Sequence, residues 1–341
     1  MTILGIETSC DETSAAIIEG DKTQPFVTVL SNVSATSLNL HAKTGGIIPE
    51  IAAREQIKYI IPVIKQAFTE ADKKPVNIDA IAVTYGPGLI GSLLVGVETA
   101  KTLAFAWNKQ IIPVNHLFGH VYANWIEKQS QQKPITFPAI ALIVSGGHTD
   151  LILMKGHKDT MWLGGTRDDA AGEAIDKIGR EINFPYPSGP AFEAAAQKGN
   201  PKAYRFPRPI MHDKQYDFSF SGLKTAAFRE IKKQALEQQQ INNLARGVQD
   251  AIIDVLIYKT LRAAEEFEIK TILLSGGVSA NQTLRDTLIK KSAEKQLNIT
   301  LHAPDKIFCT DNAAMIATAG LYMGEAKSWK DIIANPELYF D

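Results

Sequence analysis

Two histidines four residues apart could place two metal ligands on one face of a helix. His116 and His120 have this spacing, and residues i and i+4 of a helix project to the same side. Asn115 is a favourable N-cap for such a helix. A metalloprotease helix needs a glutamate directly after the first histidine as general base, but Leu117 stands there. The pair therefore indicates a metal site of another kind, with two chance surface or core histidines as the alternative interpretation.

A third ligand is expected from elsewhere in the chain, because two histidines leave a metal ion under-coordinated. Asp311 is the candidate, since it stands at the start of the last long predicted helix. Helix capping is the commoner role of an aspartate at such a position. Two histidines and one carboxylate with open coordination positions suit Fe(II) or Zn(II).

Three polar or glycine-containing turns could bind phosphate. The turn Ser145–Thr149 joins two apolar runs of strand length, and the backbone N–H groups of such a turn can wrap a phosphate. The turn Glu7–Thr13 joins two strands in the same way near the start of the chain, and Ser275–Gly277 precedes a helix, whose N-terminal amides suit a nucleotide. An ordinary hairpin is the alternative for a turn taken alone. Two related lobes, each with a phosphate-facing hairpin, would enclose a nucleotide in a cleft between them.

The elements that position these residues alternate between strands and helices. This alternation predicts an α/β fold with mixed sheets, and 341 residues suit two lobes. We expect the first lobe over residues 1–114, with residues 325–341 packed on it, and the second over 115–324, with an insertion near 198–219. Strands are expected at 3–6, 15–18, 26–33, 79–84, 110–114, 270–274, 298–301 and on both sides of the Ser145 turn. Helices are expected at 49–68, 89–105, 116–127, 168–182, 190–197, 222–238, 241–267, 280–293 and 311–324.

The composition excludes disordered and membrane-spanning classes. Hydrophobic residues make up 45% and charged residues 21% of the chain, which is typical of a soluble globular protein. No apolar run is long enough to cross a bilayer, and no signal-peptide pattern precedes the first strand. Cys10 and Cys309 form no disulfide framework and fit a reducing cytoplasm.

The net charge of −1 means that a nucleic acid would need a local basic patch. Residues 198–233 contain nine Lys or Arg against three Asp or Glu. Five aromatic residues are interleaved with them: Tyr204, Phe206, Tyr216, Phe218 and Phe220. Such a patch could contact phosphates and stack on splayed bases, and a solvated loop and helix face is the alternative interpretation.

Six motifs in order give the chain a family resemblance. It resembles the universal tRNA threonylcarbamoyladenosine transferase family, in its bacterial form, from Ile3 to about Gly324. The motifs are Gly5–Thr13, Asn115–His120, Val144–Thr149, Asp168–Ala174, Phe218–Thr225 and Ser275–Asn281. One departure is Gln56, where relatives often carry histidine.

The resemblance implies a two-lobed actin-like ATPase fold, shared with sugar kinases and heat-shock chaperones. It implies transfer of threonylcarbamoyl from threonylcarbamoyl-adenylate to N6 of the adenosine 3′ of the anticodon, in tRNAs that read codons beginning with A. It further implies one divalent metal, iron before zinc, an adenylate or ATP as nucleotide ligand, and a complex with a shorter paralogue and a small P-loop ATPase. The residues implied are His116, His120 and Asp311 for the metal, and Ile143, Val144, Ser145, Gly146, Gly147, Asp176, Gly189 and Asn281 for the substrate.

In the reaction so implied, Asp11 or Glu12 could take the proton of the attacking amine or orient it. Turn formation and solvation are the alternative roles of these two residues. Two other functions compete with the transferase. An actin-fold kinase of a small metabolite would explain the glycine turns but not the histidine pair. A non-catalytic scaffold of the same complex would lack the metal residues, whereas this chain has all three.

Overall fold

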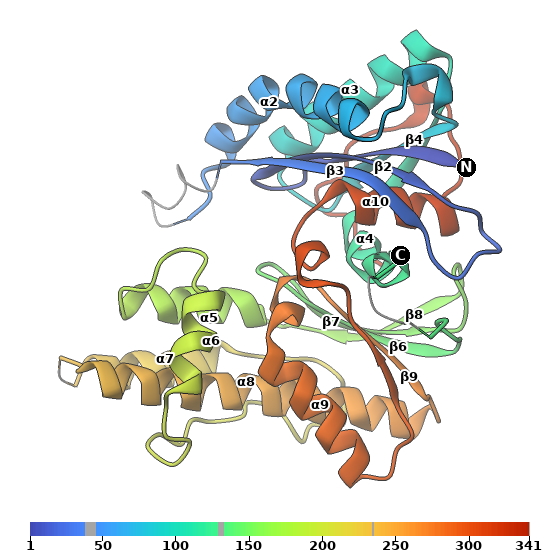
Figure 1. Cartoon of the computed structure of the whole chain (residues 1–341). Helices are drawn as coiled ribbons and strands as arrows, with labels where there is room; N and C mark the ends of the chain where they lie inside the picture. The colour runs from blue at the N-terminus through green and yellow to red at the C-terminus, as the bar shows by residue number, and fades with distance from the viewer. Residues whose placement is uncertain (38–45, 129–132, 234, 341) are drawn as a thin grey trace. The chain divides into compact units, whose positions relative to one another are not determined.

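The computed structural model describes residues 1–37, 46–128, 133–233 and 235–340. It divides into two compact units (Figure 1), Met1–Ile135 with Pro304–Asp341 as unit 1 and Thr136–Ala303 as unit 2. The predicted lobes differ from this division, because residues 115–135 and 304–324 belong to unit 1. The C-terminal segment contacts the rest of unit 1 within its described residues 325–340: Asn335 N donates to Tyr85 O at 2.7 Å, and Ile332 lies in the core of this unit.

Unit 1 is built on a five-stranded mixed sheet of order β3-β2-β1-β4-β5. Strands β1, β2 and β3 are antiparallel neighbours, whereas β4 and β5 run parallel to β1. The first strand is buried along its whole length, so its apolar residues form the centre of the core. The bounds are β1 Thr2–Glu7, β2 Glu12–Glu19, β3 Thr28–Thr36, β4 Ala80–Gly86 and β5 Gln110–Asn115.

Unit 2 repeats this topology in a second sheet of order β10-β9-β6-β7-β8. Again the first three strands are antiparallel and the last two are parallel to the first. The expected duplication is therefore confirmed, although β8 had not been predicted. The bounds are β6 Ala139–Val144, β7 Thr149–Met154, β8 Thr160–Gly165, β9 Thr271–Ser275 and β10 Thr300–His302.

Helices cover both faces of the sheet of unit 1 (Figure 1). Helices α2 (Pro49–Glu70) and α3 (Ile90–Trp107) lie on one face, and α4 (His116–Tyr122) and α10 (Ala313–Tyr322) on the other. Glycine lets α10 approach the sheet closely: a Cβ on Gly5 would lie 2.2 Å from the Ala313 carbonyl oxygen. This contact fixes the beginning of α10, directly after Asp311, against strand β1.

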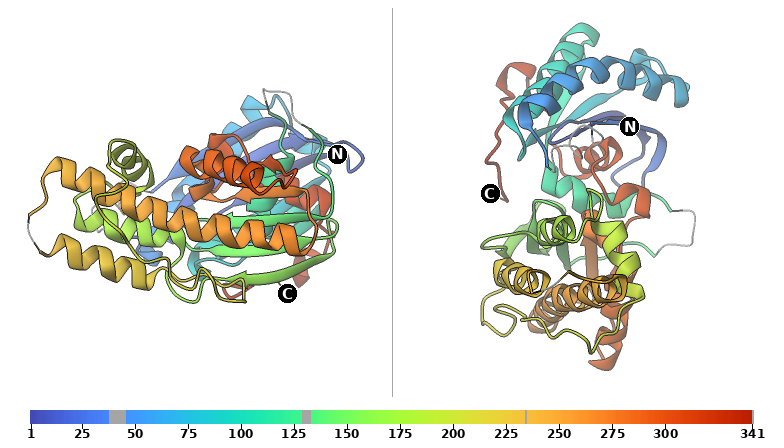
Figure 2. Two further views of the ribbon diagram at one scale, coloured as in Figure 1. Left: turned by 90° about the horizontal axis from the view of Figure 1, so that it is seen from below. Right: turned by 90° about the vertical axis from the view of Figure 1, so that its left-hand side faces the viewer.

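The helices of unit 2 bury one apolar face each in a core shared with β6, β7 and β9. The longest, α8, runs for 29 residues beside the strands (Figure 2). The bounds are α5 Ala171–Glu181, α6 Gly189–Gln197, α7 Ser221–Ile231, α8 Gln238–Glu266 and α9 Gln282–Glu294. Short 3-10 helices are η1 Pro75–Asn77, η2 Ala123–Trp125, η3 Gly277–Ala280, η4 Lys306–Phe308 and η5 Trp329–Asp331. Within the described residues, no helix combines the length and apolarity needed to cross a bilayer.

Candidate functional site

Helix α4 carries both histidines of the predicted metal site on one face. Its N-cap is Asn115, as expected, whose Oδ1 accepts a hydrogen bond from Leu117 N at 2.8 Å. Both His116 and His120 are buried. Between them, Gly119 allows close packing on α10, since a Cβ there would lie 2.5 Å from Ile316 Cδ1. The sequence thus turns the two imidazoles toward the start of α10.

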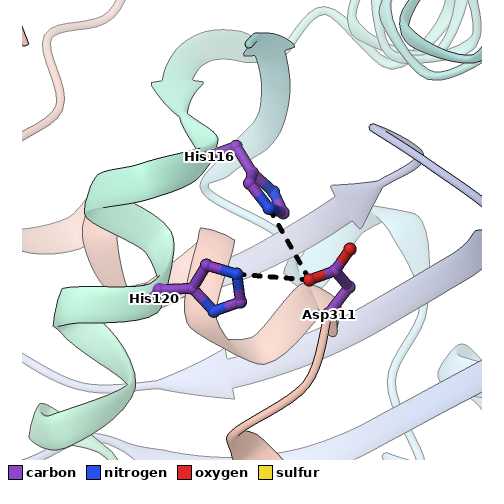
Figure 3. A group of neighbouring side chains, drawn as sticks. All are labelled: His116, His120 and Asp311. Carbon is purple, nitrogen blue, oxygen red and sulfur yellow. Dashed lines mark ion pairs between the residues drawn. The ribbon is translucent and has the colours of Figure 1, made fainter. Parts of the chain in front are cut away.

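Asp311 stands one residue before the N-cap of α10. The capping role belongs to Asn312, whose Oδ1 accepts from Met315 N at 3.0 Å. Strand β2 also holds the first residue of the helix, because Ser14 Oγ accepts from Ala313 N at 3.0 Å. The alternative interpretation of Asp311 as a cap is therefore not borne out, and its carboxylate points at the two histidines (Figure 3).

The three side chains bring their ligand atoms together within 4.8 Å of one another. Asp311 Oδ1 lies 3.2 Å from His120 Nε2 and 3.6 Å from His116 Nε2 (Figure 3). Neither ring nitrogen of the buried His120 makes a hydrogen bond with any described part of the chain. Buried polar atoms normally have hydrogen-bond partners, so the lack of a hydrogen bond at His120 Nε2, which faces Asp311, fits a metal ligand. The group could bind a metal ion, and two histidines with one carboxylate suit Fe(II) or Zn(II).

The sequence analysis missed a fourth member of this group, Glu7 at the end of β1. Its side chain is fully buried, and its Oε2 lies 3.1 Å from His116 Nδ1. Thr84 Oγ1 donates to the same oxygen, and Ser9 N donates to Oε1, each at 2.5 Å. Glu7 therefore orients the imidazole of His116 and leaves its Nε2 facing Asp311. A carboxylate behind a ligating histidine is a recurring feature of metal sites.

Charge in this buried group is balanced between acids and imidazole. Burial alone would raise the pKa of Glu7, but the charge of His116 and hydrogen bonds from His116 and Ser9 outweigh it and lower that pKa. Burial would lower the pKa of His116, but Glu7 and then Asp311 outweigh it and raise the pKa to about 9. His116 thus carries a proton near neutral pH, which an incoming divalent cation would displace.

The turn that carries Asp11 and Glu12 is tethered through its backbone. Gln56, buried on α2, donates from Nε2 to the carbonyl oxygens of Thr8, Cys10 and Glu12 at 3.4, 3.0 and 2.9 Å. Ser92 Oγ also donates to Cys10 O, Leu89 N to Ser9 O, and Ser37 N and Oγ to Asp11 O. Gln56, which stands where relatives often carry histidine, thus anchors this turn.

Glu12 begins strand β2 close to the metal-ligand group. Burial, followed by the charges of Asp311 and Asp11, raises the pKa of Glu12 well above its usual value. A carboxyl group with a raised pKa is a stronger base once it is ionised. The influence of Asp311 on it shows that the turn and the histidine group belong to one electrostatic environment.

In unit 2, glycines shape the Ser145–Thr149 turn. A Cβ on Gly276, which has a φ of +85°, would lie 2.4 Å from Val144 O, and one on Gly172 would lie 2.6 Å from Ser145 O. At Gly146 and Gly147, by contrast, a Cβ would meet no atom within 4 Å. The turn is therefore held tightly from behind and open on the side of these two glycines.

The sequence predicted that the backbone N–H groups of this turn are exposed and free to bind a phosphate, but two of them already make hydrogen bonds. Ser145 Oγ accepts from Gly147 N at 3.3 Å and from His148 N at 3.1 Å, so these two amides are already engaged. The Gly146 amide makes no hydrogen bond with the described parts of the chain. Ile143 and Val144 end strand β6 fully buried, so only their backbone could face a ligand.

Of the other predicted substrate residues, Asp176 and Gly189 are linked to this turn through contacts within unit 2. Asp176 lies on α5, whose first turn begins at the Ser145 carbonyl, and its Oδ1 accepts from Ser188 N at 2.7 Å, directly before Gly189. Burial raises the pKa of Asp176. Asn281 caps α9 by accepting from Leu284 N at 2.9 Å, and its Nδ2 donates to Gln249 Oε1 at 2.9 Å. The side chain of Asn281 therefore has a structural role as well.

Solved structures with a similar fold include two of HypF. The crystal structure of T. kodakarensis HypF has a TM-score of 0.58 at 14% identity, over 94% of this chain and 47% of that one. Full-length HypF in a phosphate- and nucleotide-bound form has a TM-score of 0.59 at 12% identity, over 94% and 55%. The chain thus spans about half the length of these proteins. Together with the duplicated sheets, this likeness defines an actin-like ATPase-type fold.

Sequence comparison then gives the family. The sequence model of the tRNA N6-adenosine threonylcarbamoyltransferase (TsaD) family matches residues 28–318 of this chain. A protein of that name from Thermomicrobium roseum is 46% identical, over 95% of this chain and 92% of the relative, and one from Bacillus subtilis is 47% identical, over 94% and 90%. The chain belongs to the tRNA N6-adenosine threonylcarbamoyltransferase family.

Proposed function

We propose that this chain transfers threonylcarbamoyl from threonylcarbamoyl-adenylate to N6 of the adenosine 3′ of the anticodon, in tRNAs that read codons beginning with A. The observation that carries the proposal is the convergence of His116, His120 and Asp311 in a chain that is nearly half identical to named transferases over almost its full length. In the reaction, the N6 amine nitrogen of the adenosine forms a bond to the carbamoyl carbon. The bond between this carbon and the phosphate oxygen of the adenylate breaks, and AMP leaves with that oxygen.

We assign one divalent cation, Fe(II) before Zn(II), to His116, His120 and Asp311. When bound, the cation would polarise the carbamoyl carbonyl and stabilise the charge that develops on its oxygen. With the cation bound, Glu7 would keep the ring proton of His116 on Nδ1, which leaves Nε2 unprotonated for the cation. Asp11 or Glu12 accepts the proton that the attacking amine loses, and the tethered backbone of their turn keeps both carboxylates in place.

The adenylate is assigned to the residues of unit 2. The open face of Gly146 and Gly147 and the unengaged Gly146 amide support a phosphate position at this turn. Ile143, Val144 and Ser145 supply its backbone frame, and Asp176, Gly189 and Asn281 complete the proposed site. ATP is the other nucleotide that this site could take, and a cytoplasmic location belongs to the same proposal.

A shorter paralogue and a small P-loop ATPase are the proposed protein partners. Exposed aliphatic side chains on the packed helices α2 and α3 support a docking surface for the paralogue: Ile57, Ile61, Ile90 and Leu94 are 64, 45, 50 and 44% exposed. We expect Ile57→Asp to weaken association with the paralogue at least tenfold in analytical ultracentrifugation, since it places a charge in an apolar contact. Association unchanged by Ile57→Asp and Ile61→Asp together would exclude this surface.

The test of the proposed function is transfer of isotopically labelled threonine into tRNA. The full chain, synthetic threonylcarbamoyl-adenylate and the expected partners are incubated with tRNA, and the nucleosides are analysed by mass spectrometry. Labelled threonylcarbamoyladenosine that forms only with this chain supports the proposal. Absence of label, with ATP consumed when a small-molecule acceptor is supplied, would favour a metabolite kinase instead.

A further inference from the structure

The irregular segment predicted as an insertion is anchored along one side of helix α8. We call residues 198–217 the strap. Its anchors are spread over most of the helix, and each joins the strap to a polar side chain of α8. They are Asn200 N to Asn243 Oδ1, Arg208 to Asp254, Lys259 Nζ to Gln215 O, Arg262 Nη2 to Lys214 O and Gln215 O, and Tyr216 OH to Glu266 Oε2. These contacts give an irregular backbone a fixed course.

The anchors separate the cations of the strap into two kinds. Residues 198–212 contain four cations and no Asp or Glu. Arg208 is engaged, with Nε and Nη2 donating to Asp254 Oδ2 at 2.9 and 2.7 Å. Lys198, Lys202 and Arg205 are exposed, and their side chains make no ion pair or hydrogen bond with the described residues. Three uncompensated positive charges therefore lie within eight residues.

Two of these cations line a hollow in the surface of unit 2, which we call the strap groove. It has a volume of about 660 Å³ and is lined by Pro201, Lys202, Tyr204, Arg205, Phe206 and Arg208. The hollow is concave and positive. A polyanion that enters the groove can therefore contact several cations at once. Lysines scattered over a convex surface would not allow this.

The aromatic residues of this region do not form the base-stacking surface that the sequence pattern had indicated. Tyr204 and Phe206 stack on each other with ring centroids 5.7 Å apart. Both lie against α8 at Gly247, where a Cβ would be 3.0 Å from Phe206 Cδ2 and 3.2 Å from Tyr204 Cβ. The rings of Phe206, Tyr216, Phe218 and Phe220 are buried. Tyr204 is half-buried and lines the groove, so the groove offers mainly charge and at most one aromatic ring.

We propose that the strap groove binds the sugar-phosphate backbone of the tRNA, with Lys202 and Arg205 each contacting a phosphate. This inference rests on the proposed function, from which the tRNA follows as substrate. Phosphate contacts fix the register of a nucleic acid without reading its sequence. Because the strap is already held by α8, binding orders two side chains but no loop, which lowers its entropic cost. The groove would therefore position any tRNA of suitable shape, and selection of the adenosine would occur elsewhere.

The test compares Lys202→Ala/Arg205→Ala with the wild-type chain and with Lys270→Ala/Lys290→Ala. The control removes the same charge from exposed positions elsewhere in unit 2. Affinity for tRNA is measured by filter binding over a series of salt concentrations, with the components of the transfer assay present. We expect affinity near 0.15 M salt to fall roughly fivefold to twentyfold, and the slope of log K against log salt to decrease by about one for each lost cation. The Lys270→Ala/Lys290→Ala control should keep the affinity and the slope of the wild type.

Other results would overturn the proposal in distinguishable ways. The Lys202→Ala/Arg205→Ala protein could keep the tRNA affinity and the salt dependence of the wild type, while the wild type transfers threonylcarbamoyl normally. This result would overturn the assignment of the groove and leave the proposed function intact. An affinity loss confined to tRNAs that carry the target adenosine would mean base recognition and would overturn the phosphate assignment. Loss of partner binding with tRNA affinity kept would make the groove a protein-docking surface. A wild-type chain that neither binds nor modifies tRNA would overturn the proposed function itself.

Discussion

Replacement of Glu7 by glutamine tests how the buried carboxylate controls the metal-ligand group. Ser9 N donates to Glu7 Oε1, and a backbone donor cannot change its role, so the glutamine oxygen must stay at that position. The glutamine NH₂ group then takes the place of Oε2, 3.1 Å from His116 Nδ1. Because NH₂ can only donate, Nδ1 becomes an acceptor, and Ser9 Oγ, 3.1 Å from the same nitrogen, can also donate to it. In the wild type, Glu7 keeps the Nδ1 proton when a cation displaces the proton on Nε2. In Glu7→Gln, the one proton of the neutral ring stays on Nε2, the atom that faces Asp311.

The magnitude follows from this change of tautomer. A histidine protonated on Nε2 must lose or move that proton before it can bind a cation through this atom. Changes to the group behind a ligating histidine typically cost 10–100-fold in metal affinity, which is about 1.4–2.7 kcal/mol. Thr84→Val, which removes the other hydrogen bond to Oε2 but keeps the carboxylate, should have a smaller effect in the same direction.

The assay is a competition titration of the metal-free proteins with Zn(II) against a chromophoric chelator, with the fold checked by circular dichroism. We expect the dissociation constant of Glu7→Gln to rise about 10–100-fold while the spectrum of the folded protein is retained. An affinity equal to that of the wild type would refute the assignment, because His116 would then not depend on Glu7 for its tautomer.

Three further predictions concern other parts of the chain. Gln56→Leu removes three hydrogen bonds to buried backbone carbonyls, so chemical denaturation should show a loss of about 2–4 kcal/mol and the transfer rate constant should fall at least tenfold; a stable variant with full activity would exclude the anchoring role. Gly147→Ala, like the control Gly156→Ala, should leave the melting temperature unchanged because both positions are open, but Gly147→Ala alone should weaken adenylate binding at least tenfold in calorimetry; equal binding by both would remove Gly147 from the site. Burial, with a contribution from Arg262, lowers the pKa of Lys259 in the folded protein to about 8. Between about pH 8 and pH 10.5 the unfolded chain therefore holds a proton on this lysine that the folded chain has lost, so the free energy of unfolding rises with pH through that window. The wild type should gain free energy of unfolding relative to Lys259→Met over this range, and a constant difference between the two proteins would contradict the prediction.

The sequence predicted those parts of the metal site that local spacing determines. His116 and His120 could be placed on one helix face by their separation, and Asn115 could be identified as the cap. The repeated pattern of strand, turn and strand predicted two related sheets, since each turn is bounded by apolar runs. Asp311 could be proposed because a third ligand was needed, although its position before α10 also fitted a cap.

Other parts depend on contacts between residues far apart in the chain. Glu7 pairs with a histidine 109 residues later, and the local signal was a glutamate directly after the apolar run Ile3–Ile6. Strand β8 has its Met161 and Trp162 exposed, which hides the usual burial pattern, but the duplication alone would have required a third strand there. The compact units differ from the predicted lobes because α10 returns to pack on β1, a contact made possible by Gly5.

The central claim is that His116 and His120 on α4, with Asp311 just before α10, form the catalytic metal centre of a tRNA threonylcarbamoyltransferase. The most direct measurement adds Fe(II) or Zn(II) stepwise to metal-stripped wild type and Asp311→Ala, and follows bound metal and labelled threonylcarbamoyladenosine in the same samples. We predict that transfer by the wild type rises in proportion to bound metal up to one ion per chain, whereas folded Asp311→Ala gains neither metal nor activity. Full transfer by metal-free Asp311→Ala would contradict the account.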